Sequence, residues 1–541
     1  MWQPGWRDQI WDQLDQKWDL IVIGGGITGA GILREATRAG IKTLLVEGND
    51  FSSGTSSRSS KLVHGGFRYL KSGQIKLTLI SVRERERLLR EGRGLVIPLG
   101  FLMANFKTDR LPPWLFGVGL TVYDMLALKG GHRYYDSSGI QELCPQLNDQ
   151  GLLGGYRYFD AETDDARLVL RVIREAVRQG GLALNYARVE GLIHSPSGRV
   201  CGVQLRDMDP DAAGRTAEVV SGVVVNATGA WANELRELVA MHKDNPPGVQ
   251  LSPRLRHLRG SHLIFPESKL PLNRAVCLWH PADGRPVFAF PWEGVTIIGT
   301  TDVDHGRVVQ TDPKISLPEA EYLLAVVTYA FPGLNLTLDD VQGTYSGIRA
   351  VLDTGKADPS KESREHVLWK ENGMLTVTGG KLTTFRLMAH DTLRAARAML
   401  PGQPVFDPHF RVLETPPAGI LESASLDAAA RLRLLGRYGA DAPELIAAAE
   451  PGELQAIASS PALWAELRWA ARAEGVIHLD DLLLRRVRLG LLLPQGGLPC
   501  LESVRRIAQR ELGWNELRWE QEVENYVRLW QESYSLNCVL T

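Results

Sequence analysis

The chain has 541 residues, of which 44% are hydrophobic and 23% charged, and its formal net charge is -2. This composition is typical of a globular protein with about two to three domains. The near-neutral charge excludes a global attraction to nucleic acid or to an anionic membrane, so any anion site must be built locally. The five cysteines form no CxxC pair, and the 12 histidines show no metal-ligand spacing. We therefore expect reduced thiols and no metal.

The N-terminal segment 1–18 is polar and contains Trp2, Trp6, Trp11 and Trp18. It lacks the basic start and the apolar run of a secretion signal. Nowhere does the sequence reach the ~18 consecutive apolar residues that a membrane span requires. We therefore expect a cytoplasmic protein whose membrane contact is peripheral, and we expect the tryptophans of this segment to contribute to that contact.

A dinucleotide-binding unit is predicted next. A buried strand over Asp19–Ile23 is followed by the glycine-rich turn Gly24–Gly29, a helix that ends near Ala39 and a second strand over Ile41–Glu47. This order is the start of a parallel, doubly wound sheet. The glycines bring backbone N–H groups against a pyrophosphate at the N-terminus of the helix. Glu47 is expected to accept hydrogen bonds from the adenosine ribose, and its charge disfavours NADP.

FAD is favoured over NAD by two further segments. Residues 52–61 are rich in hydroxyl groups, which suit the ribityl chain and pyrophosphate of a long prosthetic group. The strand expected over Val219–Ala227 leads into Thr228, Gly229 and Ala230, where backbone can pass close to the adenosine.

The apolar stretch Trp114–Tyr123 follows Lys107 and Arg110 and precedes Asp124. It is too short to span a bilayer but suits a helix that lies in the membrane interface. A buried core helix is equally compatible with these residues.

The remaining elements complete an α/β fold. Helices are expected over 76–90 and 163–179, and a hairpin over 287–300 that turns near Glu293 and Gly294. The C-terminal part predicts helices over Ala428–Tyr438, Asp480–Leu492 and Leu501–Trp530. We expect a doubly wound, Rossmann-like FAD-binding domain with a strand-rich substrate or cap domain inserted, and a C-terminal all-α domain. The predicted parts are an N-terminal segment (1–18), an FAD-binding domain within 19–400 (19–75, 150–250 and 340–400), an interleaved cap domain (76–149 and 251–339), a linker (401–420) and the helical domain (421–541).

A set of motifs in a fixed order carries a family resemblance. They are IGGGITGAG (23–31), TSSRSSKLVHGGFRYL (55–70), DDARLVL (164–170), NATGAWA (226–232), RGSHLIF (259–265), FPWEGVTIIGTTD (290–302), TYSGIRA (344–350), GGKLTTFR (379–386) and HLDDLLLRRVRLG (478–490). With them the chain resembles the FAD-dependent glycerol-3-phosphate dehydrogenases, within the D-amino-acid-oxidase-like flavoproteins. The family usually has Ala, Asp and Arg where this chain has Leu33, Glu35 and Ala39, which affects helix packing. It usually has Tyr where this chain has Phe385, and the missing hydroxyl bears on the positioning of flavin or substrate.

The resemblance implies a set of FAD contacts. The residues expected to bind the cofactor are Gly24, Gly26, Ile27, Thr28, Gly29, Glu47, Thr55, Ser56, Ser57, Ser60, Lys61, His64, Gly66, Val189, Ala227, Thr228, Gly229, Gly380, Leu382, Thr383 and Thr384. The amides of the last three would face the flavin edge that becomes negative on reduction, where a helix N-terminus is stabilising.

The resemblance also implies a phosphate-bearing substrate and its contacts. Arginine forks suit a phosphate dianion, and the expected substrate-binding residues are Arg68, Tyr69, His262, Arg349, Arg364 and Lys381. We expect His64, Lys381 and Arg349 to be catalytic. The group that accepts the hydroxyl proton stays open between His64, Lys381 and, third, His262. His64 can instead be a structural histidine, and His262 a packed core histidine.

The predicted activity is the oxidation of glycerol 3-phosphate to dihydroxyacetone phosphate by hydride transfer to FAD. The resemblance implies a membrane quinone as acceptor and peripheral attachment to the cytoplasmic face of the inner membrane. The alternatives are an oxidase that uses O2, a related flavoenzyme acting on a hydroxy acid or amine, and an inactive scaffold. The C-terminal helices leave open a contact or homodimer surface.

Overall fold

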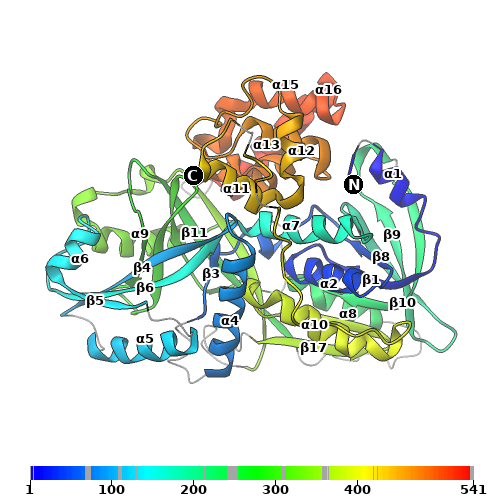
Figure 1. The fold of residues 1–541 in the computed structure, drawn as a ribbon, viewed down its shortest axis with the longest axis horizontal. Helices are drawn as coiled ribbons and strands as arrows, with labels where there is room; N and C mark the ends of the chain where they lie inside the picture. The colour runs from blue at the N-terminus through cyan, green and yellow to red at the C-terminus, as the bar shows by residue number, and fades with distance from the viewer. Residues whose placement is uncertain are drawn as a thin grey trace.

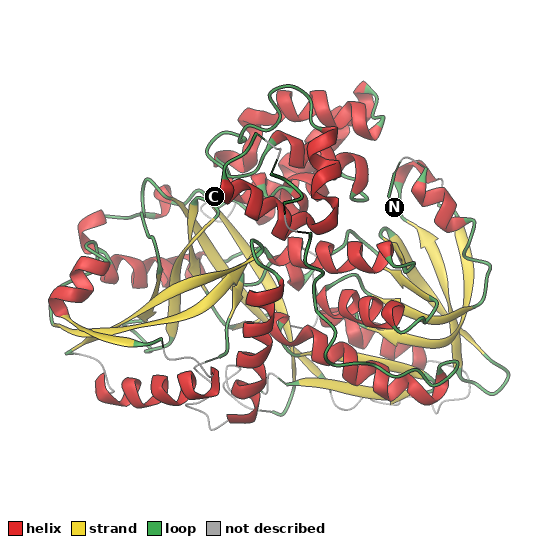
Figure 2. Cartoon of the chain, viewed as in Figure 1, coloured by secondary structure: helices red, strands yellow, loops and turns green. Residues whose placement is uncertain are grey.

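The computed structural model describes residues 2, 3, 5–66, 75–107, 113–127, 131–212, 214–240, 254–306, 309, 312–355, 362, 365–417, 419–422 and 425–536. Two sheets lie side by side, and a group of helices caps the junction between them (Figures 1 and 2). This arrangement confirms the predicted fold class: a Rossmann-like part, a strand-rich insertion and a C-terminal helical part.

The first sheet has the parallel core that the glycine-rich βαβ motif predicts. Its strand order is β17-β18-β10-β1-β2-β7, with β9 on β10 and β8 on β9. The five strands from β18 to β7 are parallel, and the others pair antiparallel. The strand bounds are β1 (Trp18–Ile23), β2 (Thr43–Val46), β7 (Leu182–Leu184), β8 (Ala187–His194), β9 (Val200–Asp207), β10 (Thr216–Asn226), β17 (His366–Glu371) and β18 (Met374–Gly379).

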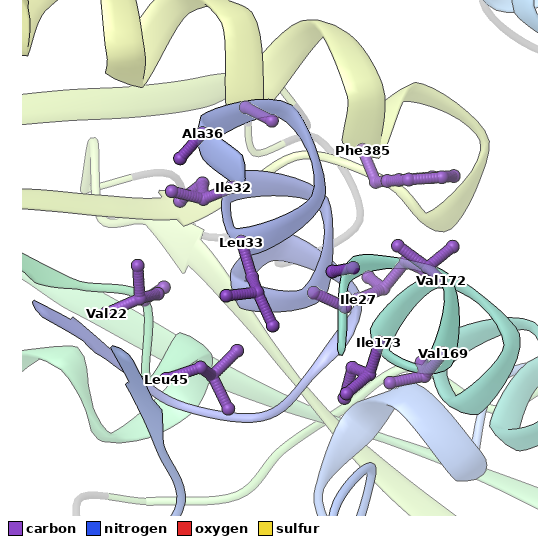
Figure 3. Packing of buried hydrophobic residues seen from close by; sticks show 14 of the residues in the cluster. Val22, Ile27, Ile32, Leu33, Ala36, Leu45, Val169, Val172, Ile173 and Phe385 are labelled. Atoms are coloured by element: carbon purple, nitrogen blue, oxygen red, sulfur yellow. The ribbon is translucent and has the colours of Figure 1, made fainter. Parts of the chain in front are cut away.

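Three helices bury one face of this sheet: α2 (Ile27–Arg38), α7 (Asp165–Arg178) and α10 (Phe385–Ala396). Figure 3 shows Ile32 and Leu33 of α2 between the sheet residues Val22 and Leu45 and the facing helices. Phe385 belongs to this core, where the missing side chain of Gly31 leaves room for its ring. Phe385 therefore packs between two helices, and a tyrosine hydroxyl at this position would lie in that helix–helix contact.

The N-terminal tryptophans also belong to a core, contrary to the expectation that they help to bind a membrane. Trp2 stacks on Phe51 with ring centroids 5.1 Å apart. Trp11 and Trp18 are buried where helix α1 (Trp6–Trp11) and helix α8 (Ala232–Ala240) cover the sheet. Burial of these apolar rings on folding leaves them unavailable to a lipid surface.

The second sheet is larger and mostly antiparallel, in the order β15-β11-β14-β13-β12-β4-β6-β3, with β16 on β11 and β5 on β6. Its strands are β3 (Leu62–Val63), β4 (Val96–Phe106), β5 (Arg133–Asp136), β6 (Leu152–Thr163), β11 (Leu255–Pro266), β12 (Ala275–Trp279), β13 (Pro286–Trp292), β14 (Val295–Gly299), β15 (Val303–Asp304) and β16 (Gly343–Leu352). Its flanking helices are α4 (Ile75–Glu91), α5 (Pro113–Ala127), α6 (Ser137–Leu143) and α9 (Leu317–Ala330).

The points at which the chain passes from one sheet to the other differ from the predicted domain boundaries. Strands β3, β6 and β16 fall in segments assigned to the FAD-binding part, but they pair within the second sheet. Strand β6 passes directly into helix α7 of the first part. The predicted hairpin over 287–300 is present as the antiparallel pair β13 and β14.

The predicted helix over Ala428–Tyr438 is present with the same bounds, whereas the other two predicted C-terminal helices are broken into shorter pieces. The stretch 480–492 forms a π-helical turn, η10 (Asp481–Arg486), and then α14 (Leu489–Leu492), because Arg488 adopts φ 64°. The stretch 501–530 is split at Gly513, whose φ of 69° ends the first helix. The other helices are α11 (Ala428–Tyr438), α12 (Ala442–Ala448), α13 (Trp464–Ala473), α15 (Leu501–Leu512) and α16 (Glu516–Ser533).

Candidate active site

One large cavity of about 1260 Å³ lies between the two sheets and collects most of the predicted site residues. The predicted cofactor residues that line it are Gly24, Gly26, Ile27, Thr28, Glu47, Thr55, Ser56, Ser60, His64, Gly66, Val189, Ala227, Thr228, Gly229, Gly380, Leu382 and Thr383. Most of them follow the carboxyl ends of β1, β2 and β10 or lie in the turn after β18, and the others belong to β8 and to the segments on either side of β3. Ligands of doubly wound sheets bind at this edge.

The glycine turn fits a dinucleotide because side chains are sterically excluded there. A Cβ at Gly24 would lie 2.6 Å from the carbonyl oxygen of Ala227, and one at Gly29 would lie 1.9 Å from that of Gly24. Gly29 itself does not line the cavity but allows α2 to start this close to β1. The backbone at the start of α2 is thus open to a pyrophosphate.

Glu47 stands at the tip of β2 as predicted. Its carboxylate accepts hydrogen bonds from the backbone N–H groups of Gly25 (2.7 Å) and Asn49 (2.9 Å). Burial raises the pKa of Glu47, and these two hydrogen bonds oppose the shift. A carboxylate held in this way at the cavity wall suits a ribose diol.

A second helix start faces the cavity at the other end. Gly379 and Gly380 have φ of 78° and 72°, and they turn the chain from β18 into the short helix η7 (Leu382–Thr384) and then α10. Leu382 and Thr383 line the cavity, whereas Thr384 does not. This helix start favours negative charge on whatever lies against it.

Two basic side chains reach the cavity from separate elements. Arg349 of β16 lines it, and its guanidinium donates to Asp302 Oδ1 at 3.3 Å and Thr300 Oγ1 at 3.2 Å. Lys381 lines it as well, with Nζ donating to Ser81 Oγ at 3.1 Å. His64 lines the same cavity. The structure therefore brings the three predicted catalytic residues to one chamber.

His262 lies outside the cavity lining. Its ring stacks on Tyr345 with centroids 4.4 Å apart, and Nε2 is 2.9 Å from Ser60 Oγ. Burial lowers the pKa of His262 well below its usual value, and Arg349 and Lys61 add to the shift. This environment matches the packed core histidine that the sequence left as an alternative.

Lys61 and Ser57 are also placed behind the lining rather than in it. The Lys61 ammonium is fully buried against Asp165 Oδ1 at 2.9 Å and the Ser57 carbonyl oxygen at 3.1 Å. The contribution of Lys61 to the cofactor site is therefore indirect. Arg68, Tyr69 and Arg364 lie outside the described residues, and their expected substrate contacts stay predictions.

Asp160 is a lining residue that the sequence reasoning missed. Its Oδ1 accepts from the backbone N–H of Gly65 at 3.1 Å and from the Tyr123 hydroxyl at 2.7 Å, and it pairs with Arg85. Burial raises the pKa of Asp160, with Arg85 opposing. The carboxylate thereby fixes the turn that carries His64.

An aromatic arm of the cavity was missed as well. It runs beneath helix α5 and is lined by Phe101, Met103, Phe116, Tyr158, Cys277, Trp279 and Phe288. Phe116 of α5 faces Trp279 across it, with ring centroids 5.7 Å apart. Thr300 and Asp302, at the polar end, stand in a motif that the sequence had singled out without assigning them a role.

Comparison with known proteins agrees with this geometry. A family model described as FAD dependent oxidoreductase matches residues 19–386, and the C-terminal domain of alpha-glycerophosphate oxidase matches residues 395–519. The chain is 34% identical over 549 aligned residues to glycerol-3-phosphate dehydrogenase 2 of Mycobacterium bovis, covering 97% of this chain and 90% of the relative.

The chain belongs to the FAD-dependent glycerol-3-phosphate dehydrogenase family.

Two further members support the assignment. The aerobic glycerol-3-phosphate dehydrogenase of Bacillus subtilis is 37% identical over 399 residues, covering 73% of this chain and 69% of that protein. The crystal structure of the glycerol-3-phosphate dehydrogenase from Bacillus halodurans complexed with FAD superposes with a TM-score of 0.78 at 30% identity, covering 98% of each chain. The predicted family and the FAD cofactor are confirmed, and FAD is the group that the glycine turn and Glu47 fit.

Proposed function

We propose that this dehydrogenase oxidises glycerol 3-phosphate to dihydroxyacetone phosphate and passes the electrons to a membrane quinone. One observation carries the proposal: a single cavity joins a dinucleotide cradle, a basic chamber and an aromatic arm beneath an exposed apolar helix. Each part suits one component of the reaction, namely the cofactor, the phosphate-bearing substrate and a lipophilic acceptor.

The basic chamber suits the substrate. Asp302 and Thr300 orient the Arg349 guanidinium at the cavity wall, and a planar guanidinium in a fixed orientation suits the geometry of a phosphate. Lys381 adds a second positive charge, positioned by Ser81. FAD, when bound, supplies the hydride acceptor. The side chains then bind the dianion, orient the carbinol carbon and remove the hydroxyl proton.

His64 is the proposed acceptor of the hydroxyl proton. It lines the chamber, whereas His262 is stacked in the core. Asp160 holds the neighbouring Gly65 amide and so restrains the position of the His64 backbone. A positioned base of this kind typically contributes 10²–10⁴-fold to a rate.

Helix α5 supports a membrane as the source of the acceptor. Trp114, Val118 and Met125 are 65%, 54% and 68% exposed, and they repeat at helical spacing along one face. The opposite face, with Phe116, packs on the aromatic arm. The inner face therefore matches the buried alternative predicted for this stretch, and the exposed apolar face supports the interfacial one. We place the outer face in the membrane interface, and among the described residues no helix is long and apolar enough to cross a bilayer.

The acceptor is tested by reoxidation of the substrate-reduced enzyme. A lipophilic quinone analogue should reoxidise the flavin faster than air-saturated buffer does. Trp279→Ala should raise the KM for the quinone without slowing flavin reduction by glycerol 3-phosphate, and Trp514→Ala, an aromatic outside the cavity lining, should change neither. Faster reoxidation by air would identify an oxidase instead.

A further inference from the structure

The segment that supports the predicted adenosine and pyrophosphate side of the cavity has little structure of its own. We call residues 48–60 the cofactor loop; it connects β2 to β3 and contains only the short helix η1 (Thr55–Ser57). Ser52, Thr55 and Ser56 of this loop line the cavity, and Ser52 adopts φ 64°. A loop of this kind needs support from other elements to hold a fixed shape.

That support comes from the C-terminal helical domain. Arg486 of the π-helical turn η10 donates two hydrogen bonds to the Asp50 carboxylate, Nη1 to Oδ2 at 2.6 Å and Nη2 to Oδ1 at 2.8 Å. Arg485 donates to the same carboxylate at 2.5 Å. All three side chains are buried. Burial alone would raise the pKa of Asp50, but the two guanidinium groups outweigh it and hold that pKa below its usual value.

Arg488, which follows this turn, reaches the loop at a second point. Arg488 Nη2 donates to the carbonyl oxygen of Ser57 at 3.0 Å and to Asp165 Oδ1 at 3.0 Å. Lys61 Nζ donates to the same two partners. Arg488 takes the left-handed conformation that ends the π-helical turn, which presents its side chain to the first part of the chain instead of continuing the helix.

A third contact lies at the end of the described chain. The Tyr534 hydroxyl accepts from Arg58 Nη2 at 2.9 Å and Nε at 3.2 Å. The C-terminal part therefore contacts the cofactor loop at Asp50, Ser57 and Arg58, through residues more than 400 positions later in the sequence. Asp50 also accepts from Asn185 Nδ2 at 3.0 Å. The charges of this junction are removed from water, so each depends on its partner.

We propose that the C-terminal helical domain clamps the cofactor loop through Arg485, Arg486 and Arg488, and so determines how tightly the enzyme retains FAD. Arg486 is a positioning residue in this account, because it acts through Asp50 and lies outside the cavity lining. Retention of FAD and docking of the domain are then linked, and each stabilises the other. Figure 1 places this domain on the side of the molecule opposite α5, away from the proposed membrane face.

The test compares two arginines of the same domain. Arg486→Gln removes the two-point grip on Asp50. Arg468→Gln removes a similar buried grip, on Glu453 at 2.6 and 2.7 Å, that lies within the C-terminal domain. We measure the FAD dissociation constant by flavin fluorescence as the apoprotein is reconstituted, and the thermal unfolding midpoint of each variant.

The clamp predicts that Arg486→Gln weakens FAD binding on the order of tenfold, an effect comparable in size to the loss of metal affinity when a partner of a metal ligand is removed. Arg468→Gln should lower the unfolding midpoint but leave the FAD dissociation constant unchanged. Equal changes in the FAD dissociation constant for both variants, or none for Arg486→Gln, would overturn the proposal.

Asp50→Asn and hydrogen exchange keep the proposal testable if Arg486→Gln does not fold. Asp50→Asn should weaken FAD binding while the C-terminal domain stays intact. In the wild-type protein, FAD should slow amide exchange across residues 481–488, by reciprocity of the linkage. Exchange there that is indifferent to FAD would contradict the clamp.

Discussion

At the scale of single residues, the proposed chemistry rests on the fixed direction of the Arg349 guanidinium. Its bonds to Asp302 and Thr300 restrict the side chain, which reduces the entropy lost when a phosphate binds. Truncation to alanine should therefore remove charge-assisted hydrogen bonds and leave the dinucleotide cradle untouched.

We predict that Arg349→Ala raises the KM for glycerol 3-phosphate roughly tenfold to a hundredfold, since a hydrogen bond to a charged group contributes about 1.5–3 kcal/mol. The FAD content should stay that of the wild type. Arg206→Ala, which removes an arginine paired with Glu190 on an exposed strand, is the control. An unchanged KM for Arg349→Ala would show that the phosphate is bound elsewhere.

Sequence alone predicted much of the lining but not the direction of every side chain. Glu47, Arg349 and Lys381 were expected in the site and line the cavity. His262 and Lys61 stand in equally good motifs but point into the packed layer around Tyr345 and Asp165. A motif fixes position along a strand, whereas the face that a side chain takes depends on sheet register and on partners distant in sequence.

At the scale of elements, helix α5 connects the surface to the cavity. Its outer apolar face is exposed, and its inner face carries Phe116 and the Tyr123 hydroxyl that binds Asp160. The sequence could not choose between an interfacial and a buried helix, because both faces are apolar.

We predict that the double variant Val118→Glu, Met125→Glu reduces co-sedimentation with lipid vesicles, because two carboxylates would have to be placed in an apolar layer. Leu517→Glu replaces an apolar residue that is 75% exposed on α16, and it should sediment as the wild type does. Turnover with a water-soluble electron acceptor should be the same in all three proteins. Undiminished vesicle binding by the double variant would remove α5 from the membrane interface.

The C-terminal helical domain contains a pH-sensitive pair of residues that links the loop before η10 to α16. His478 Nδ1 lies 2.9 Å from Glu522 Oε1. Burial alone would lower the pKa of His478, but the bond to Glu522 and the charge of Asp481 outweigh it and raise the pKa to about 9. The histidine is then protonated in the folded protein at a pH where the unfolded chain is neutral.

Since the folded pKa is raised, the pair contributes its full stability below about pH 6.5 and loses it as the pH rises through about 9. The contribution is roughly 3–4 kcal/mol, at about 1.4 kcal/mol per pKa unit. Denaturant unfolding at pH 6 and pH 9.5 should show a smaller difference for His478→Gln than for the wild type. Equal pH dependence in the two proteins would exclude the pair as its source.

At the scale of the whole molecule, the arrangement depends on contacts between segments far apart in sequence. The βαβ start, the hairpin over 287–300 and the helical C-terminal part were predictable from local patterns. The assignment of β6 and β16 to the second sheet was not, because their partners β4 and β11 are chosen by long-range pairing. The arginine contacts between the C-terminal domain and the cofactor loop could not be predicted for the same reason, because they also join segments far apart in the sequence.

Anaerobic titration with glycerol 3-phosphate tests the central claim most directly. The structure places a dinucleotide cradle, Arg349, Lys381 and His64 around one cavity. The substrate should therefore bleach the yellow absorption of the bound FAD in a single turnover. The Arg349→Ala variant should need a higher concentration of glycerol 3-phosphate for the same bleaching. Bleaching by a hydroxy acid or an amine but not by glycerol 3-phosphate, or no bleaching at all, would contradict the account.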